Sequence, residues 1–408
     1  MKVVFFLILL LIFLLPIGQL GRLEFGQGVV LFYNDFVITL TIVLWIINSL
    51  AIRKSLKLPP VSLLVLLFTT VSLLSLLNGA RNLSVSETLV SSLYLLRWVE
   101  YVFLFIIVWD LSKKLKNTRK TLIYCLIASS LIVAILGFFQ LRLIPDFSEI
   151  ASLGGWDPHQ GRILSTFFDP NFVGGFFVLS LSLTTSLFLF SNRGNEKLFL
   201  GASGLILLLA LILTLSRSSY LALAVAALTF AFFKSRKIFI AFLIIGVLAI
   251  TFLPNVKTRL EDLVTLDKSA LARVESWQKA FSISRENLLL GVGFNSYRFA
   301  QDRYGFFSFN EPTGGHSGSG ADSSLLLVLA TTGILGLGLY FSLHLKIFLE
   351  GLKRRKNPLG LALIVSLFAL FSHSLFVNSL FYPAIMEWLW ILTGLTFSVS
   401  RGEINEFS

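Results

Sequence analysis

The residue best suited to chemistry in this sequence is an arginine between two apolar stretches. Arg217 stands in Ser216-Arg217-Ser218, between the apolar runs 198–215 and 219–233. A guanidinium can bind a phosphate or a carboxylate through two parallel hydrogen bonds. No acidic residue lies close to Arg217 in the sequence. We therefore predict that Arg217 binds a ligand anion. The alternative is a side chain that reaches solvent or pairs with a distant carboxylate.

Other patterns of ligand-binding residues are weaker. The glycine-rich stretch 314–320 has no Lys-Ser or Lys-Thr pair after it, so it is not a phosphate-binding P-loop. No Asp-x-Asp, His-x-x-x-His or cysteine cluster indicates a metal site.

Four charged residues lie within or near the apolar runs. Arg97 and Glu100 are three residues apart, which allows a pair on one helix face. Asp35 and Glu387 stand near the expected ends of helices, from which each could reach water.

Composition determines the kind of fold that must position these residues. Of the 408 residues, 55% are hydrophobic and only 14% are charged, which leaves too little polar surface for a globule in water. We expect an all-α polytopic membrane protein, a single integral membrane domain over 1–408, because helices satisfy their own backbone hydrogen bonds in lipid. About twelve runs are long enough to be transmembrane helices. They are 3–17, 29–51, 58–77, 89–110, 121–143, 172–191, 198–215, 219–233, 238–253, 323–345, 358–377 and 385–400.

The basic residues predict the orientation of these helices. The net charge is +12, and most lysines and arginines fall on alternate short loops, which is typical of the cytoplasmic side of a membrane protein. We expect both termini in the cytoplasm, a location in the cytoplasmic (inner) membrane, and a retained first span. The same bias explains the positive charge without nucleic acid as a partner. The lone Cys125 allows no disulfide within the chain.

Two long segments then face outward. The larger, 254–322, is expected to carry short helices, and the second is 144–171. Long segments between membrane helices are usually functional or disordered. Within 254–322, Leu271, Val274 and Phe281 recur at helical spacing with Trp277, so the spacing predicts an amphipathic helix that packs on the membrane surface or on the bundle through this apolar stripe.

Four motifs along the chain resemble the family of O-antigen ligases and O-antigen polymerases. They are Gly161-Arg162 with Ser165-Thr166-Phe167 and Asp169-Pro170-Asn171; Ser216-Arg217-Ser218; Arg273 and Trp277 followed by Gly291-Val292-Gly293; and Asp322-Ser323 followed after nine residues by Gly333-Ile334-Leu335-Gly336-Leu337. The last motif departs from the ligase pattern, because Asp322 stands where those enzymes have a histidine. The motifs cover about 150–345, and the arrangement of spans is similar over the whole chain.

The resemblance implies a membrane glycosyltransferase of cell-surface polysaccharide biosynthesis. Its donor would be a glycan on a polyprenyl diphosphate such as undecaprenyl diphosphate, and the acceptor a hydroxyl of a glycan or lipid at the outer face. Such enzymes are similar in using no nucleotide sugar, no cofactor and no obligatory metal. Arg217 and Arg273 match the family's functional arginines and would bind the diphosphate, with Arg162 as a third candidate. The acceptor needs a base, which would be Asp322 or His316.

Several alternatives stay open at this stage. Asp322 could instead be an ordinary helix N-cap assisted by Ser323. The enzyme could polymerise lipid-linked repeats or ligate a finished glycan to an acceptor. A non-enzymatic exporter or flippase of lipid-linked saccharide is a further possibility. It would need a charged path through the bundle, whereas the polar residues concentrate on the outer face.

Overall fold

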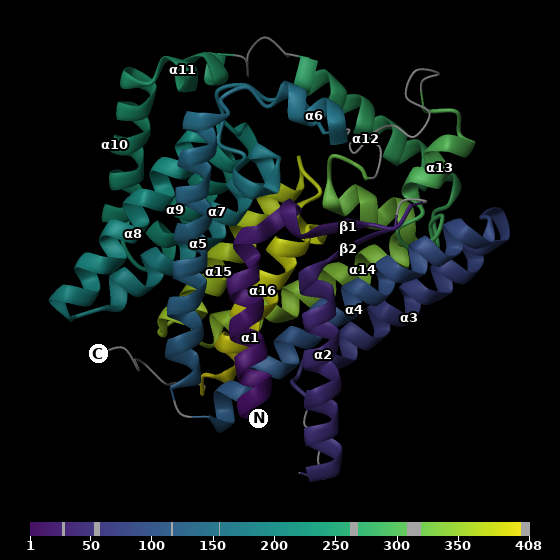
Figure 1. The fold of residues 1–408 in the computed structure, drawn as a ribbon, viewed down its shortest axis with the longest axis horizontal. Coiled ribbons are helices and arrows are strands. Elements are labelled where there is room, and N and C mark those ends of the chain that lie inside the picture. The colour runs from purple at the N-terminus through teal and green to yellow at the C-terminus, as the bar shows by residue number, and fades with distance from the viewer. Residues whose placement is uncertain are drawn as a thin grey trace.

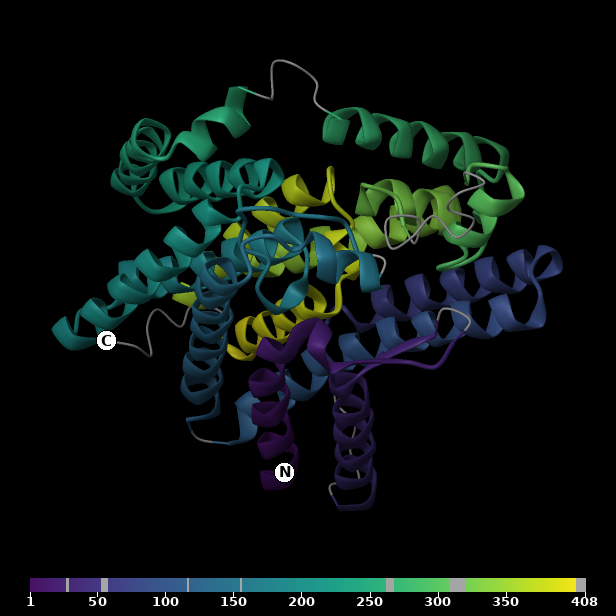
Figure 2. The same cartoon turned by 45° about the horizontal axis from the view of Figure 1, so that its top comes forward.

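The computed structural model describes residues 1–26, 29–52, 58–115, 117–154, 156–261, 268–307 and 320–400. Its helices are α1 (Lys2–Leu14), α2 (Tyr33–Ile47), α3 (Ser62–Gly79), α4 (Val85–Lys114), α5 (Thr118–Leu143), α6 (Ser148–Gly154), α7 (Pro170–Phe190), α8 (Gly194–Leu213), α9 (Arg217–Phe233), α10 (Arg236–Phe252), α11 (Pro254–Glu261), α12 (Lys268–Glu286), α13 (Tyr297–Arg303), α14 (Ser324–Leu352), α15 (Pro358–Ser374) and α16 (Pro383–Ser398). Figures 1 and 2 show their arrangement.

The protein is a polytopic α-helical membrane protein. Each of the twelve predicted spans coincides, in whole or in part, with a helix. Within the described residues, eight helical segments are long and apolar enough to cross a membrane, and α9 and α15 are shorter apolar helices. The number twelve therefore stays a prediction. One departure from an all-helical chain is a small antiparallel hairpin of β1 (Arg22–Glu24) and β2 (Val30–Phe32), with Leu23 opposite Leu31.

The centre of the bundle is formed by α4, α7, α15 and α16. The residues of α16 from Ala384 to Ser398 are all buried, as are most residues of α7 and α15. In lipid, close packing through small residues brings helices together. Gly394 of α16 illustrates this, because an added Cβ would lie 2.7 Å from the Phe105 carbonyl of α4. The outer helices are less covered, and α10 buries only Ala249.

The charges inside the bundle pair differently from the prediction. Arg97 does not pair with Glu100. Its Nη2 instead lies 2.7 Å from Asp35 Oδ2, and Glu100 accepts a hydrogen bond of 2.9 Å from Thr39. Asp35 and Glu387 are 6% and 1% exposed, so neither reaches water as we expected. A buried carboxylate needs a partner more than an exposed one does, and Asp35 on the neighbouring helix offers Arg97 a fully buried contact.

The segments predicted to lie outside gather at one end of the molecule. Helices α6, α11 and α12 lie across the top of Figure 1, and the N-terminus lies near the bottom. The amphipathic helix is present as α12. Leu271, Val274 and Phe281 of its apolar stripe are 56%, 40% and 61% exposed, so these residues do not pack on the bundle, and packing on the membrane surface stays a prediction. Trp277 of the stripe and the neighbouring Ala280 lie on the face toward the protein, where Trp277 and Ser276 make polar contacts with the chain before α14.

Candidate active site

The turn that carries Arg217 has an unusual backbone. Leu215 adopts φ 51°, a conformation that non-glycine residues rarely take. Ser216 caps α9 by accepting a hydrogen bond from the Ser219 amide, and Arg217 is the first residue of that helix. Arg217 is half-buried. A non-glycine residue in this region costs about 1–3 kcal/mol, and such strain clusters at functional sites.

Arg162 holds this turn in place. It is 9% exposed, and its Nε and Nη2 donate hydrogen bonds of 2.8 Å and 3.1 Å to the carbonyls of Thr214 and Leu215. The next residue, Ile163, donates its amide to the Leu213 carbonyl at 2.9 Å. The 144–171 segment therefore supports the backbone just ahead of Arg217, which is a role that the sequence did not indicate for Arg162.

The start of α7 lies against the same turn. Asp169 is the N-cap of α7, and its Oδ1 accepts from the amides of Asn171 and Phe172 at 2.7 Å and 3.0 Å. Asn171 in turn accepts a hydrogen bond of 2.8 Å from the Ser216 hydroxyl. Two motifs that are 45 residues apart in sequence therefore meet through side chains.

His373 of α15 contacts the two serines that follow Arg217. Its Nε2 lies 3.3 Å from the hydroxyl oxygens of both Ser218 and Ser219. It is fully buried. The contact of His373 with the two residues after Arg217 could not be predicted, because the position of a histidine within an apolar run does not show which distant segment it contacts.

Helix α12 lies over the start of α14 through one polar face. The indole Nε1 of Trp277 donates to the Asp322 carbonyl, and the Asp322 amide donates to Ser276 Oγ, each at 2.9 Å. Arg273 is three residues before Ser276 and four before Trp277, so it lies on the same face of α12. The two hydrogen bonds fix the backbone of Asp322 beneath α12.

Asp322 is not the cap of α14. Ser323 is the N-cap, and its hydroxyl accepts from the Leu326 amide at 3.4 Å. Among the described residues, no hydrogen bond reaches the Asp322 carboxylate. Burial raises the pKa of Asp322 to about 6. Arg273 opposes this rise in pKa, and the charges of Asp157 and Asp169 add to it. A pKa near 6 suits a general base better than the ordinary value of an aspartate.

Positive charge converges on the same region. The pKa of Arg162 is lowered to about 10 by burial and by the charges of Arg259 and Arg273, against the opposing effect of Asp169. Arg259, on α11, was missed by sequence reasoning, because nothing in its neighbourhood distinguishes it from a surface arginine. The charge of Arg273 thus acts on the pKa of both Arg162 and Asp322.

Three further residues of this region could hold a cation. Asp157, His159 and Asp169 place one ligand atom each within 4.8 Å of one another. The His159 Nε2 lies 3.9 Å from Asp169 Oδ2. Burial raises the pKa of Asp169, but the hydrogen bond and charge of His159, the Phe172 amide and Arg162 outweigh it and leave that pKa below its usual value. The spacing of Asp157 and His159 could have suggested the pair, but Asp169 joins them only through the fold.

The two glycine motifs position α12 and α14 relative to each other. Gly333 interrupts α14 with φ 65°, and an added Cβ there would lie 2.2 Å from the Leu289 carbonyl. The amides of Val292 and Gly293 donate to the carbonyls of Ala330 and Thr331 at 3.0 Å and 3.1 Å. The chain after α12 therefore replaces part of the internal hydrogen bonding of α14, and this contact requires glycine.

The predicted site residues thus divide into three groups. Arg162, Arg273 and Asp322 lie in one electrostatic environment. Arg217 follows directly on the turn that Arg162 holds. His316 lies outside the described residues.

Comparison with known proteins agrees with this geometry. Residues 202–341 match the family model described as O-antigen ligase. This match supports an assignment to the O-antigen ligase and polymerase family. The match includes Arg217, Arg273 and Asp322, but not the 144–171 segment with Arg162. No curated protein matches the chain.

The match to the O-antigen ligase model supports a role in cell-surface glycan biosynthesis and suggests an enzyme of the membrane glycosyltransferase kind. The family implies lipid-linked glycans and membrane lipids as the surroundings in which it works. The matched segment runs from α8 into α14. It therefore contains the turn at Leu215, helix α12 and Asp322.

Proposed function

We propose that the protein transfers a glycan from a polyprenyl diphosphate carrier to an acceptor hydroxyl at the outer face of the cytoplasmic membrane. The observation that carries this proposal is the shared environment of Arg273 and Asp322. The positive charge of Arg273, which suits a leaving diphosphate, acts on the Asp322 carboxylate, whose pKa burial raises to about 6. Together they would provide the two groups that a glycosyl transfer from a diphosphate needs.

The arginines would bind the donor. Arg217 and Arg273 engage the diphosphate, whose negative charge grows as the glycan leaves, and fixed cations stabilise that charge. Arg162 supports the Arg217 turn through two backbone carbonyls, and its remaining N–H groups can add to the positive field. Arg259 contributes to the same field.

Asp322 would act as the base. The acceptor hydroxyl gives its proton to the Asp322 carboxylate while its oxygen bonds to the anomeric carbon of the donor. The bond between that carbon and the diphosphate oxygen breaks, and the carrier leaves as polyprenyl diphosphate. Attack from the face opposite the diphosphate inverts the configuration. His316 is the alternative base.

The proposed orientation places this site outside the cell. Lys2 and the N-terminus lie at the opposite end of the molecule from α11 and α12, which supports cytoplasmic termini and an outward-facing site. The basic loops support the same orientation. In this arrangement a lipid-linked donor reaches the site from the outer leaflet.

Product sizing tests the proposed function. Purified protein is incubated with a polyprenyl-diphosphate glycan, and both free carrier and product length are measured. A ladder of lengths identifies a polymerase, and a single addition to a second acceptor identifies a ligase. Transport of the lipid-linked glycan across vesicles without carrier release would instead identify the exporter and contradict the proposal.

A further inference from the structure

The serines on either side of Arg217 form one hydrogen-bond network. Ser216, Ser218 and Ser219 are 0%, 5% and 0% exposed, whereas Arg217 itself is half-buried. The Ser219 hydroxyl donates to Ser216 Oγ at 2.9 Å, and Ser218 Oγ lies 3.1 Å from the same atom. This serine network therefore joins the backbone before Arg217 to the backbone after it.

Two neighbouring helices hold the serine network at its two ends. The Ser216 hydroxyl donates to Asn171 Oδ1 of α7 at 2.8 Å, and His373 Nε2 of α15 lies 3.3 Å from Ser218 Oγ and Ser219 Oγ. The Ser219 hydroxyl gives its own proton to Ser216, so it can only accept a hydrogen bond from His373. This arrangement requires that Nε2 of His373 carries the proton and donates.

The helices around His373 are packed closely. The imidazole is fully buried. A Cβ added at Gly175 of α7 would lie 3.1 Å from His373 Cε1, and a Cβ added at Gly174 would lie 2.2 Å from Ser219 Oγ. A side chain in a close-packed core keeps its position, so the imidazole is a rigid support for the start of α9.

This support matters because the turn before Arg217 is strained. Leu215 has φ 51°, and such a residue persists only where its surroundings hold it. Arg162 holds the turn from one side, through the Thr214 and Leu215 carbonyls. The serine network, which ends at His373, holds the residues on the other side of Arg217. The Arg217 side chain therefore extends from a backbone that is fixed on both sides.

We propose that His373 is a positioning residue for Arg217. Its hydrogen bonds to Ser218 and Ser219 fix the start of α9 and thereby hold the Arg217 guanidinium where it binds the diphosphate of the donor. The proposal rests on the proposed function, which assigns Arg217 to that diphosphate. A displacement of about 1 Å in an active site can cost a factor of about 100 in rate, so a side chain outside the site can control what Arg217 does.

The test measures binding of farnesyl diphosphate, a short polyprenyl diphosphate, by titration calorimetry. His373→Leu removes the donor to both serines, and we expect about tenfold weaker binding. His373→Gln places an amide N–H near the position of Nε2, so it should restore the affinity to within about twofold of that of the native protein. The double variant Ser218→Ala with Ser219→Ala removes the partners instead of the histidine. It should weaken binding as much as His373→Leu, and it carries the comparison if His373→Leu does not fold.

His344→Leu is the matched control. His344 is also a buried histidine of the bundle, but its Nδ1 lies 2.9 Å from the Tyr340 carbonyl of its own helix, α14. Both leucine variants lose a buried hydrogen bond, so both should lower the melting temperature. Only His373→Leu should weaken diphosphate binding, because a histidine with a purely structural role changes the folded fraction and not the affinity of the folded protein.

Carrier release is measured on the same preparations, so that the two proposals fail separately. Equal diphosphate binding by the native protein, His373→Leu and the double serine variant overturns the role of His373, and carrier release by the native protein then leaves the proposed function standing. Binding by His373→Gln that is as weak as binding by His373→Leu also overturns that role. Binding that depends on His373, in a native protein that releases no carrier, supports the positioning role and contradicts the proposed function. A native protein that does not bind the diphosphate overturns both.

Discussion

The pH dependence of turnover gives a sharp test of the base. The pKa of Asp322 is raised to about 6, chiefly by burial, and a base works only when it is deprotonated. About nine in ten Asp322 side chains are ionised at pH 7, and about one in ten at pH 5. Turnover should therefore fall about tenfold as the pH falls from about 7 to about 5. An aspartate with the ordinary pKa of ~3.9 would lose less than about a tenth of its activity over this interval.

The assay is carrier release from the lipid-linked donor at saturating concentration, with folding checked at each pH. A diphosphate diester has no group that titrates in this range, so the profile reports the enzyme. Asp322→Asn should lose activity at every pH. His316→Ala should keep both the activity and the profile, which distinguishes the two candidate bases.

A profile that stays flat between these pH values would refute the proposed environment of Asp322. Activity in Asp322→Asn together with a dead His316→Ala would reverse the assignment of the base. Arg273→Gln removes the cation that lowers the pKa of Asp322, so any residual activity should show its midpoint at higher pH.

Three other predictions concern the architecture. Gly333→Ala should destabilise the protein severely, because its Cβ would lie 2.2 Å from a carbonyl oxygen, whereas Gly338→Ala in the same helix meets nothing within 4 Å and should be tolerated; thermal melting in detergent compares them. Asp322→Asn should raise the melting temperature at neutral pH. The raised pKa of Asp322 favours the folded state below its unfolded pKa near 3.8, and this contribution is lost as the pH rises through about 6. The gain should therefore largely vanish near pH ~4, and an equal gain at both pH values would contradict it. Trp277→Phe removes one hydrogen bond to the Asp322 carbonyl, at a cost of about 1 kcal/mol, and should lower turnover more than donor binding; an unchanged rate would show that this contact does not position Asp322.

Local motifs predicted where two helices of the candidate site begin, because the residues that cap a helix are close in sequence. The Ser216-Arg217-Ser218 turn begins a helix as expected. Asp169-Pro170 opens α7 with a side-chain cap and a proline in the first turn. The apolar runs predicted each described helix that is long and apolar enough to cross a membrane, because a span requires a fixed length of apolar chain.

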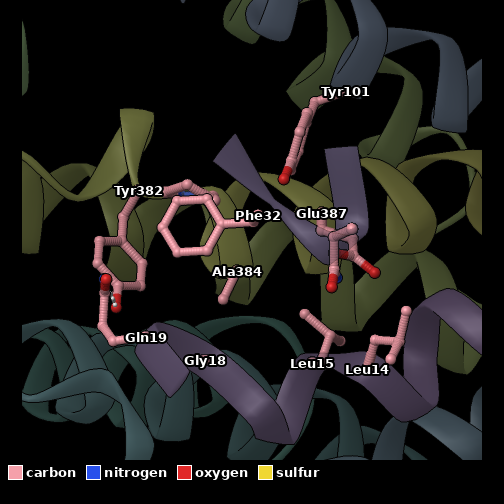
Figure 3. A pocket seen from close by; sticks show the side chains of 11 residues that line it. Leu14, Leu15, Gly18, Gln19, Phe32, Tyr101, Tyr382, Ala384 and Glu387 are labelled. Atoms are coloured by element: carbon pink, nitrogen blue, oxygen red, sulfur yellow. Dashed lines mark hydrogen bonds between the residues drawn. The ribbon is translucent and has the colours of Figure 1, made fainter. Parts of the chain in front are cut away.

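Contacts between distant segments could not be predicted in the same way. Apolar spacing left open whether the stripe of α12 packs on the membrane surface or on the bundle, and the hydrogen bond from Trp277 to the Asp322 carbonyl, which fixes the face toward the protein, joins segments 45 residues apart. Arg97 had an acid three residues away and still paired with Asp35. The small cavity beside Glu387, shown in Figure 3, combines residues from four separate parts of the chain, and no single sequence pattern contains it.

The central claim is that Arg217 and Arg273 hold a lipid diphosphate while its glycan departs. The most direct measurement is the rate of carrier release from a polyprenyl-diphosphate glycan by the native protein, Arg217→Gln and Arg273→Gln, with melting temperatures measured in parallel. We predict release by the native protein and a loss of at least about 100-fold in each variant, without a loss of folding. Undiminished release by both variants would contradict the claim.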